Sequence, residues 1–350
     1  MKNKKVLSLL LGVALVTSLV GCSSKEGTGT TGTSGAATNS SAEPLTITFA
    51  HSSAEATSTN QAALKFKEYV EANSNGQLLV NVYPNAQLGG DRELVENTQN
   101  GTVTAMISSP APQVSFVPAA TIFDTPFVFS DLKQGRAVLQ DADFTKAIGA
   151  EYQKAGFHYL GASGQGFRTL TSNKKVTTMA DLKGLTIRTM ENKYHLKAWQ
   201  LLGANPTPLA FNELYTALQQ GTVDAQENPV ELVVSQKFYE QQKYIMNTNH
   251  ILQTNTVIMN EAFYDGLSDE LKAVVDEAGK QAVDTANKVN DEKFEANKKV
   301  ITDFGDEFVE ISSEEIAKFA EAAKPVYEDI KAGTTPAVYD SYFAAIEKNK

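Results

Sequence analysis

Strand-like and helical segments alternate along the first part of the chain, and this alternation limits the fold more than any other feature. Residues 45–50 (LTITFA) alternate apolar and polar side chains as a strand does, and residues 58–73 have the spacing of an amphipathic helix. A strand at 78–83, a helix at 91–100 and a short strand at 105–108 are predicted next. This order predicts an α/β fold in which helices flank a largely parallel sheet.

The alternation returns in the second half of the chain. Strands are predicted at 159–163, 167–171, 185–189 and 222–225, and helices at 191–202 and 212–220, the latter with Asn212 as N-cap. Trp199 is expected in the core of this half. Because 350 residues are too many for one ordinary core, two α/β lobes are expected.

Residues 268 to about 300 keep helical spacing of apolar side chains without a proline. Ser268 can cap this helix, and the acidic residues after it complement the helix dipole. At about 1.5 Å per residue the helix would exceed roughly 40 Å, which is long enough to bridge both lobes. A strand at 308–311 and a helical tail are expected to complete the chain.

The N-terminus has the layout of a secretory signal. Basic residues precede the apolar run 6–20, which ends in Gly21-Cys22. Residues 19–22 (LVGC) resemble the lipobox of bacterial lipoproteins, so 1–21 is interpreted as signal peptide and Cys22 as the lipidated residue. The alternative is an ordinary signal peptide that contains a cysteine. Residues 22–44 are rich in Gly, Ser and Thr and are predicted to be a flexible tether.

The composition limits the classes of partner and cofactor that the chain is expected to bind. The net charge of −10 argues against nucleic acid and against an anionic membrane surface. Cys22 is the only cysteine, which excludes an internal disulfide. The four histidines are scattered, and neither a nucleophile elbow, a P-loop nor a GxGxxG fingerprint occurs, so no metal, cofactor or enzymatic activity is expected.

Two arginines are the candidates for binding an anion. Arg168 follows a Gly-rich stretch on a predicted strand, and Arg188 ends the strand at 185–189 on the face opposite Leu185 and Ile187. The ends of strands are where α/β sheets bind ligands, and a guanidinium suits a carboxylate with two parallel hydrogen bonds. From the pattern alone, a surface ion pair remains the alternative for each.

Several longer motifs carry a family resemblance. In order, 184–188 (GLTIR), 202–208 (LGANPTP), 213–221 (ELYTALQQG) and 223–229 (VDAQENP) resemble the solute-binding proteins of TRAP transporters, the DctP type. The stretch 123–129 (FDTPFVF) supports this, and the likeness runs from about residue 45 to the long helix.

The resemblance implies a two-lobe, periplasmic-binding-protein-like fold that closes on its ligand, with a long helix spanning both lobes. The chain would cross between lobes near Gly164 and Gln253. Approximate bounds are 45–165 plus 254–293 for lobe I, and 166–253 plus 294–350 for lobe II. The implied function is an extracytoplasmic receptor that delivers a small organic acid to small and large integral membrane subunits of the transporter. With Cys22 lipidated, the receptor would be anchored in the periplasm or on the outer face of the cytoplasmic membrane.

The resemblance also implies which residues contact the ligand. Arg188 would hold the ligand carboxylate, Asn228 would brace Arg188 and touch the ligand, and Arg168 would be a second basic contact. Ser52 and Ser109 would supply polar groups from the first lobe.

Two departures from sialic-acid-type members disfavour that ligand. Ser109 stands where those carry a glutamate, and residues 189–192 (TMEN) replace a Val-Pro-Asn run. Glu191 could accept hydrogen bonds from sugar hydroxyls, or it could be an exposed first-turn helix residue. A sugar acid such as a uronate or aldonate is favoured, with a C4-dicarboxylate as the alternative. The other hypotheses on function are a receptor for an ATP-driven importer and a secreted enzyme on the same fold.

Overall fold

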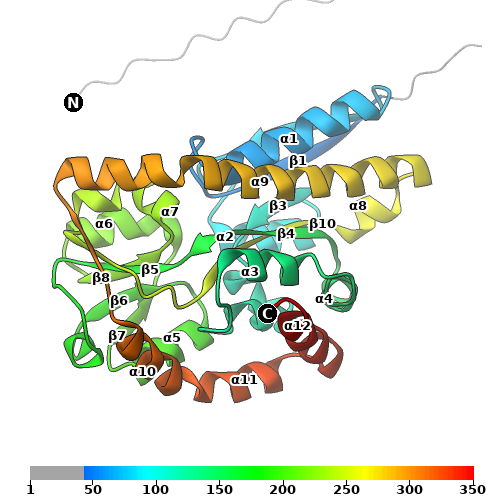
Figure 1. Ribbon diagram of the computed structural model, residues 1–350. Coiled ribbons are helices and arrows are strands. Elements are labelled where there is room, and N and C mark those ends of the chain that lie inside the picture. Colours follow the sequence, from blue (N-terminus) through cyan, green and yellow to red (C-terminus); the bar gives the residue numbers. More distant parts are fainter. Residues whose placement is uncertain (1–42) are drawn as a thin grey trace, which may run out of the picture. The chain divides into compact units, whose positions relative to one another are not determined.

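Two mixed β-sheets organise residues 43–350, the part of the chain that the computed structural model describes (Figure 1). The first sheet has the order β2-β1-β3-β10-β4 and the second the order β11-β9-β5-β8-β6-β7. The strands of the first sheet are β1 (Leu45–Ala50), β2 (Leu78–Tyr83), β3 (Ala105–Ser108), β4 (Phe157–Phe167) and β10 (Leu252–Asn260). Those of the second are β5 (Thr169–Ser172), β6 (Thr186–Thr189), β7 (Asn205–Pro208), β8 (Ala225–Asn228), β9 (Tyr244–Met246) and β11 (Glu307–Val309).

Helices surround both sheets, which confirms the α/β fold with two lobes. The helices are α1 (Ser58–Asn73), α2 (Asp91–Gln99), α3 (Leu132–Leu139), α4 (Ala142–Lys154), α5 (Lys193–Leu201), α6 (Leu214–Gln219), α7 (Val230–Ser235), α8 (Glu261–Asp265), α9 (Asp269–Phe304), α10 (Ser313–Ala323), α11 (Pro325–Gly333) and α12 (Pro336–Lys348). Short 3₁₀ turns are η1 (Ala111–Ser115), η2 (Pro118–Asp124), η3 (Met179–Leu182), η4 (Phe211–Glu213) and η5 (Phe238–Glu240).

The expectation of a largely parallel sheet is only half right. In the first sheet β1 pairs in parallel with β2 and β3, but β10 is antiparallel to both β3 and β4. In the second sheet β5 is antiparallel to β8 and β9. The reason is that β10 brings the chain back from the second sheet to the first and so runs against its neighbours.

Several helices and strands begin, end or are capped at other residues than the sequence predicted. The strand expected at 222–225 is instead β8, at Ala225–Asn228. Its four residues (AQEN) are all buried, and three of them are polar, so the strand has no apolar pattern by which its bounds could be predicted. The helix expected at 212–220 is η4 followed by α6, so Asn212 lies inside a 3₁₀ turn and is not an N-cap. Helix α5 begins at Lys193 with Asn192 as its N-cap. Trp199 is buried in the core of the second sheet, as expected.

The long helix α9 lies along both lobes (Figure 1). The side chain of Ser268 caps it by accepting from the N–H of Leu271, and Gly305, with φ of 103°, ends it. Its 36 residues span roughly 54 Å. It packs against α1 on the first lobe and α7 on the second, which confirms the expected spanning helix.

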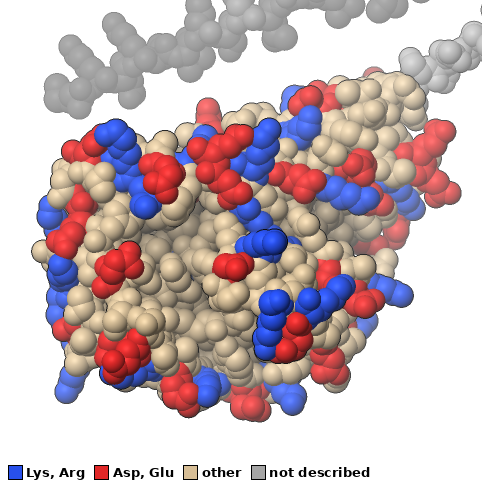
Figure 2. Space-filling model, viewed as in Figure 1, with Lys and Arg blue, Asp and Glu red and all other residues tan. Residues whose placement is uncertain are grey.

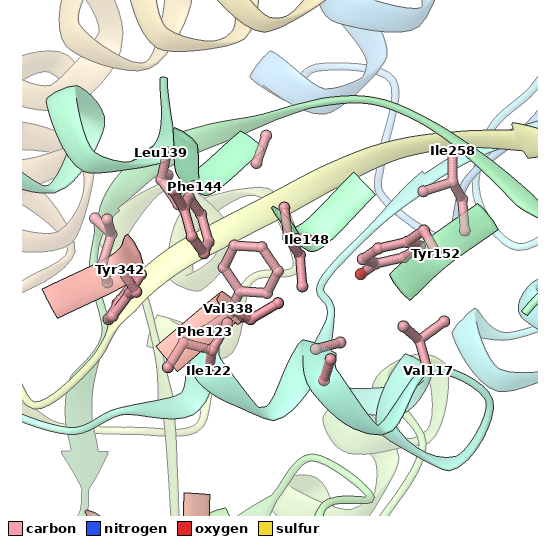
Figure 3. Close-up of a cluster of buried hydrophobic side chains, with 14 of the residues drawn as sticks. Val117, Ile122, Phe123, Leu139, Phe144, Ile148, Tyr152, Ile258, Val338 and Tyr342 are labelled. Carbon is pink, nitrogen blue, oxygen red and sulfur yellow. The ribbon is translucent and has the colours of Figure 1, made fainter. Parts of the chain in front are cut away.

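The C-terminal segment packs on both lobes. Phe319 of α10 joins the core of the second sheet. Val338 and Tyr342 of α12 pack with Phe123 and Phe144 in the cluster that covers the first sheet (Figure 3). The lobe bounds expected from the sequence stay a proposal, and these contacts favour assigning α12 to the first lobe instead of the second.

The two strand connections between the sheets run side by side. Strand β4 is separated from β5 only by Arg168, whose backbone N–H donates to the carbonyl of Ile251 at 2.9 Å, just before β10. The register of the β4–β10 pair shifts between Leu252 and Thr254, opposite Gly164. These are the places where the resemblance implied that the chain crosses between lobes.

Candidate ligand-binding site

A cavity of about 260 Å³ is lined by residues of both sheets. The first sheet contributes the loop after β1, the start of α2 and the end of β3, while the second contributes the ends of β6 and β8 and the segment 209–213. All six predicted contact residues line this cavity: Arg188, Arg168, Asn228, Glu191, Ser52 and Ser109. The fold therefore brings together residues that are up to 176 positions apart in the sequence, from Ser52 to Asn228.

Arg168 donates four hydrogen bonds to neighbouring protein groups. Its Nε and Nη2 donate to the carboxylate of Glu227, Nη2 also donates to the Glu227 carbonyl, and Nη1 donates to Gln253. Both side chains of the ion pair are buried. Its charge is therefore offset by Glu227, which leaves little of it for a ligand.

His250 completes this buried network. Its Nε2 lies 2.8 Å from Oε2 of Glu227, and its Nδ1 lies 2.9 Å from the hydroxyl of Thr248. Burial acts to raise the pKa of Glu227, but Arg168 and the hydrogen bond with His250 outweigh it and hold that pKa well below its usual value. Burial lowers the pKa of His250, and Glu227 offsets only part of that shift. The apolar pattern gave no signal for Glu227, because a buried polar strand has no apolar period, and the motif at 223–229 assigned this residue no role.

Arg188 is the buried cation that is left without an anion. It is 1% exposed, and its Nε and Nη2 donate to the carbonyl of Leu209 at 2.8 and 2.6 Å. Its Nη1 has no hydrogen-bond partner among residues 43–350. Burial lowers the pKa of Arg188 to about 10, against the attraction of Glu227, Asp91 and Glu191, so the side chain stays charged at neutral pH. Arg188 lines the cavity, and a planar guanidinium with an unpartnered donor has the chemistry that suits pairing with an anion.

Asn228 does not brace Arg188 as the resemblance implied. Its Nδ2 donates to Oε1 of Gln226 at 2.6 Å, and the Leu209 carbonyl orients Arg188 instead. The acceptor that Arg188 uses is thus a backbone carbonyl and not the amide oxygen of Asn228.

The wall from the first sheet is polar, and it carries Asp91 and Glu93 beside Arg92. The hydroxyl of Ser52 donates to Oδ1 of Asp91 at 2.5 Å, and Ser109 accepts from the N–H of Ala111 at 3.4 Å. Burial and the charge of Glu191 raise the pKa of Asp91, although the Ser52 hydrogen bond and Arg188 oppose the shift. Asp91 was missed as a site residue. Its position at the start of a helix after a Gly-Gly loop, beyond the end of β2, was the available signal.

Glu191 is exposed and lies in the turn between β6 and α5. It is therefore not a first-turn helix residue, because α5 begins two residues later. On the face drawn in Figure 2, acidic and basic side chains are interspersed and no broad patch of one sign is visible.

A two-lobe fold with a cavity between its sheets, lined by a buried arginine, is typical of a solute receptor. The model of the bacterial extracellular solute-binding proteins, family 7 (DctP), matches residues 49–333. The chain belongs to this family, whose members are receptors of transporters and not enzymes. The resemblance drawn from the sequence is confirmed.

Individual relatives agree. The chain is 40% identical over 215 residues to a solute-binding protein of Verminephrobacter eiseniae, a match that covers 61% of this chain and 64% of that protein. It is 34% identical to the C4-dicarboxylate-binding periplasmic protein DctP of Rhodobacter capsulatus, over 83% of this chain and 87% of the relative. The crystal structure of the sugar acid binding protein DctPAm from Advenella mimigardefordensis, in complex with galactonate, superposes with a TM-score of 0.83 at 30% identity, covering 88% and 99% of the two chains.

The predicted signal peptide, lipidated Cys22 and most of the tether lie outside the described residues. Within residues 43–350, no helix has both the length and the apolar character that crossing a membrane requires.

Proposed function

We propose that this chain is the receptor of a TRAP transporter and binds a sugar acid, such as a uronate or an aldonate, by pairing its carboxylate with Arg188. The observation that carries the proposal is the free Nη1 donor of a buried, charged guanidinium lining the cavity. A bound carboxylate would satisfy that donor and neutralise the charge. Membrane subunits of the transporter would then receive the acid from the closed receptor.

The charges around Arg188 favour hydroxyls at the far end of the ligand. Asp91 and Glu191 both line the cavity and interact electrostatically with Arg188, while Arg168 is neutralised by Glu227. A second ligand carboxylate would meet these acidic groups, and the remaining cation of the lining, Arg92, is exposed to solvent that screens its charge. Sugar hydroxyls can donate hydrogen bonds to the acidic groups. Among structural relatives at 30% identity, one is bound to galactonate and another to succinate, so the choice of a sugar acid rests on these charges.

A C4-dicarboxylate is the second candidate, because the relative from Rhodobacter capsulatus is named for that ligand class. A further alternative is that the chain is the receptor of an ATP-driven importer, and the family match weighs against it. We also propose that lipidation at Cys22 anchors the receptor to the membrane, an inference that rests on the sequence alone.

A thermal-shift screen separates the ligand classes. Purified protein is heated with D-galactonate, D-galacturonate, succinate or L-malate at equal concentration. We expect the sugar acids to raise the melting temperature more, since a ligand at a hundred times its Kd adds about 2.7 kcal/mol of stability. A larger shift with succinate or malate would contradict the sugar-acid assignment and support the dicarboxylate.

Asp91→Asn tests whether Asp91 makes the cavity prefer a ligand with hydroxyls at its far end over one with a second carboxylate. Because the change removes a negative charge beside Arg188, we expect the ratio of affinities for galactonate over succinate to fall by about tenfold. Calorimetric titration of both acids measures the ratio. Glu96→Gln, on the exposed side of the same helix α2, is the matched control and should leave the ratio unchanged. An unchanged ratio in Asp91→Asn would remove Asp91 from the selectivity.

A further inference from the structure

A buried carboxylate outside the cavity joins the two lobes. Glu231 lies in α7, three residues after Asn228, and is 5% exposed. Its Oε1 accepts from the backbone N–H of Ser58 at 2.7 Å, and its Oε2 accepts from the Ser58 hydroxyl at 2.6 Å. Ser58 begins α1, which packs beside the first sheet, so each carboxylate oxygen receives a donor from the opposite lobe.

The chemistry of this contact makes it sensitive to the position of the lobes. An N–H at the start of the 16-residue helix α1 has no partner within the helix, and a carboxylate is favoured there by the helix dipole. A buried carboxylate is costly unless its oxygens are hydrogen-bonded. Moving α1 away from α7 would break both hydrogen bonds at once.

The segment between β1 and α1 is held at a second point. The Nζ of Lys293, on α9, donates to the carbonyl of Ala56 at 2.6 Å. The same segment carries Ser52 and Ser53, and both line the cavity. The position of this cavity wall therefore depends on a contact with α7 of the second lobe and on a contact with α9, which packs on both lobes.

We propose that Glu231 is a positioning residue for ligand capture, which holds the β1–α1 segment against the second lobe in the arrangement that encloses the ligand. This inference rests on the proposed function of the cavity. Glu231 does not line the cavity, so it acts on how long the enclosed state lasts and not on which acid is chosen.

The first test measures binding. Galactonate and galacturonate are titrated into wild type, Glu231→Ala, Glu231→Gln and Ser235→Ala, and dissociation is followed by stopped flow. We expect Glu231→Ala to weaken both acids by about 10- to 100-fold, mostly through faster dissociation, because charge-assisted hydrogen bonds are lost. Glu231→Gln keeps an acceptor for the Ser58 N–H and should lose less.

Two readouts distinguish positioning from a general loss of stability. The ratio of the two affinities should stay within about twofold of wild type, since the cavity lining is unchanged. Ser235→Ala lies on the same helix and removes a hydroxyl that has no hydrogen-bond partner among the described residues, so its Kd should match wild type. Wild-type Kd and dissociation rate in Glu231→Ala would overturn the proposal.

A second test needs no ligand. Cysteines replace the exposed Glu68 on α1 and Gln220 after α6 in a chain that carries Cys22→Ser, and spin labels on them report the separation of the lobes. We expect longer and broader distances in Glu231→Ala than in its parent. Identical distributions would overturn the role of Glu231 even if wild type binds neither sugar acid, a result that would contradict only the proposed ligand.

Discussion

Arg188→Ala is expected to lose nearly all affinity for the cognate acid, by about 100-fold or more. Truncating one partner of a buried, hydrogen-bonded charge pair costs about 2–5 kcal/mol, because the other charge is left without its partner. Here the stranded group is the ligand carboxylate, since Leu209 orients Arg188 but cannot replace it. Calorimetric titration of the acid that wild type binds measures the loss.

Two further variants show what kind of group is required. Arg188→Lys keeps the charge but not the planar fork, so we expect an affinity between those of wild type and the alanine variant. Arg92→Ala removes an exposed cation from the lining of the same cavity and should have a small effect. Equal losses in Arg92→Ala and Arg188→Ala would mean that a general positive field, and not a specific pair, attracts the ligand.

The stability of the ligand-free protein gives an independent check on Arg188→Ala. Wild type buries a guanidinium whose Nη1 has no partner among the described residues, and removing that unpaired group relieves a desolvation cost. The variant should therefore unfold at a similar or higher urea concentration without ligand. A large drop in the unfolding midpoint would indicate that Arg188 supports the fold, and its effect on binding would then be indirect.

Glu227→Gln is expected to produce the largest loss of folding stability, about 3–5 kcal/mol in the free energy of unfolding. Removing one member of a buried ion pair leaves an uncompensated charge, here that of Arg168, and weakens the contact with His250. Urea denaturation at neutral pH measures the change. Glu328→Gln, exposed on α11, is the control and should change stability by less than about 0.5 kcal/mol.

The same pair gives a dependence on pH with a definite sign. The pKa of Glu227 is depressed in the folded state, so its contribution to stability is fully present above its unfolded value of 4.5. That contribution is lost as the pH falls from there through the lower, folded pKa. Wild type should therefore lose unfolding free energy more steeply than Glu227→Gln below pH 4.5. Parallel curves for the two proteins would contradict the assignment.

The sequence predicted elements whose periodicity was strong and local. The alternation of β1, the apolar face of α1 and the capped start of α9 agree with the structure, because each depends on neighbouring residues. Strand β10 and the buried polar strand β8 could not be placed so well, since burial on both faces removes the alternation.

The candidate site shows the same limit. Arg188 and Arg168 could both be nominated from their places on predicted strands, and the family motifs then added Asn228. The carbonyl of Leu209 and the carboxylate of Glu231 could not be found, because both act through contacts made by distant segments. Which cation is already neutralised is likewise decided by tertiary structure, as the pairing of Arg168 with Glu227 shows.

The side-by-side crossing of the two strand connections has a mechanical consequence. Two adjacent strands, with the stiff α9 running past both lobes, permit rotation about one line and resist other relative movements. Relative motion of the lobes would then be described mainly by one angle, and any such motion must be accommodated by the C-terminal segment, in which α10 packs on the second lobe, α11 contacts both lobes and α12 packs on the first. If the lobes close on a solute, a partner that touches both lobes would sense occupancy of the cavity by that angle alone, without contacting the solute.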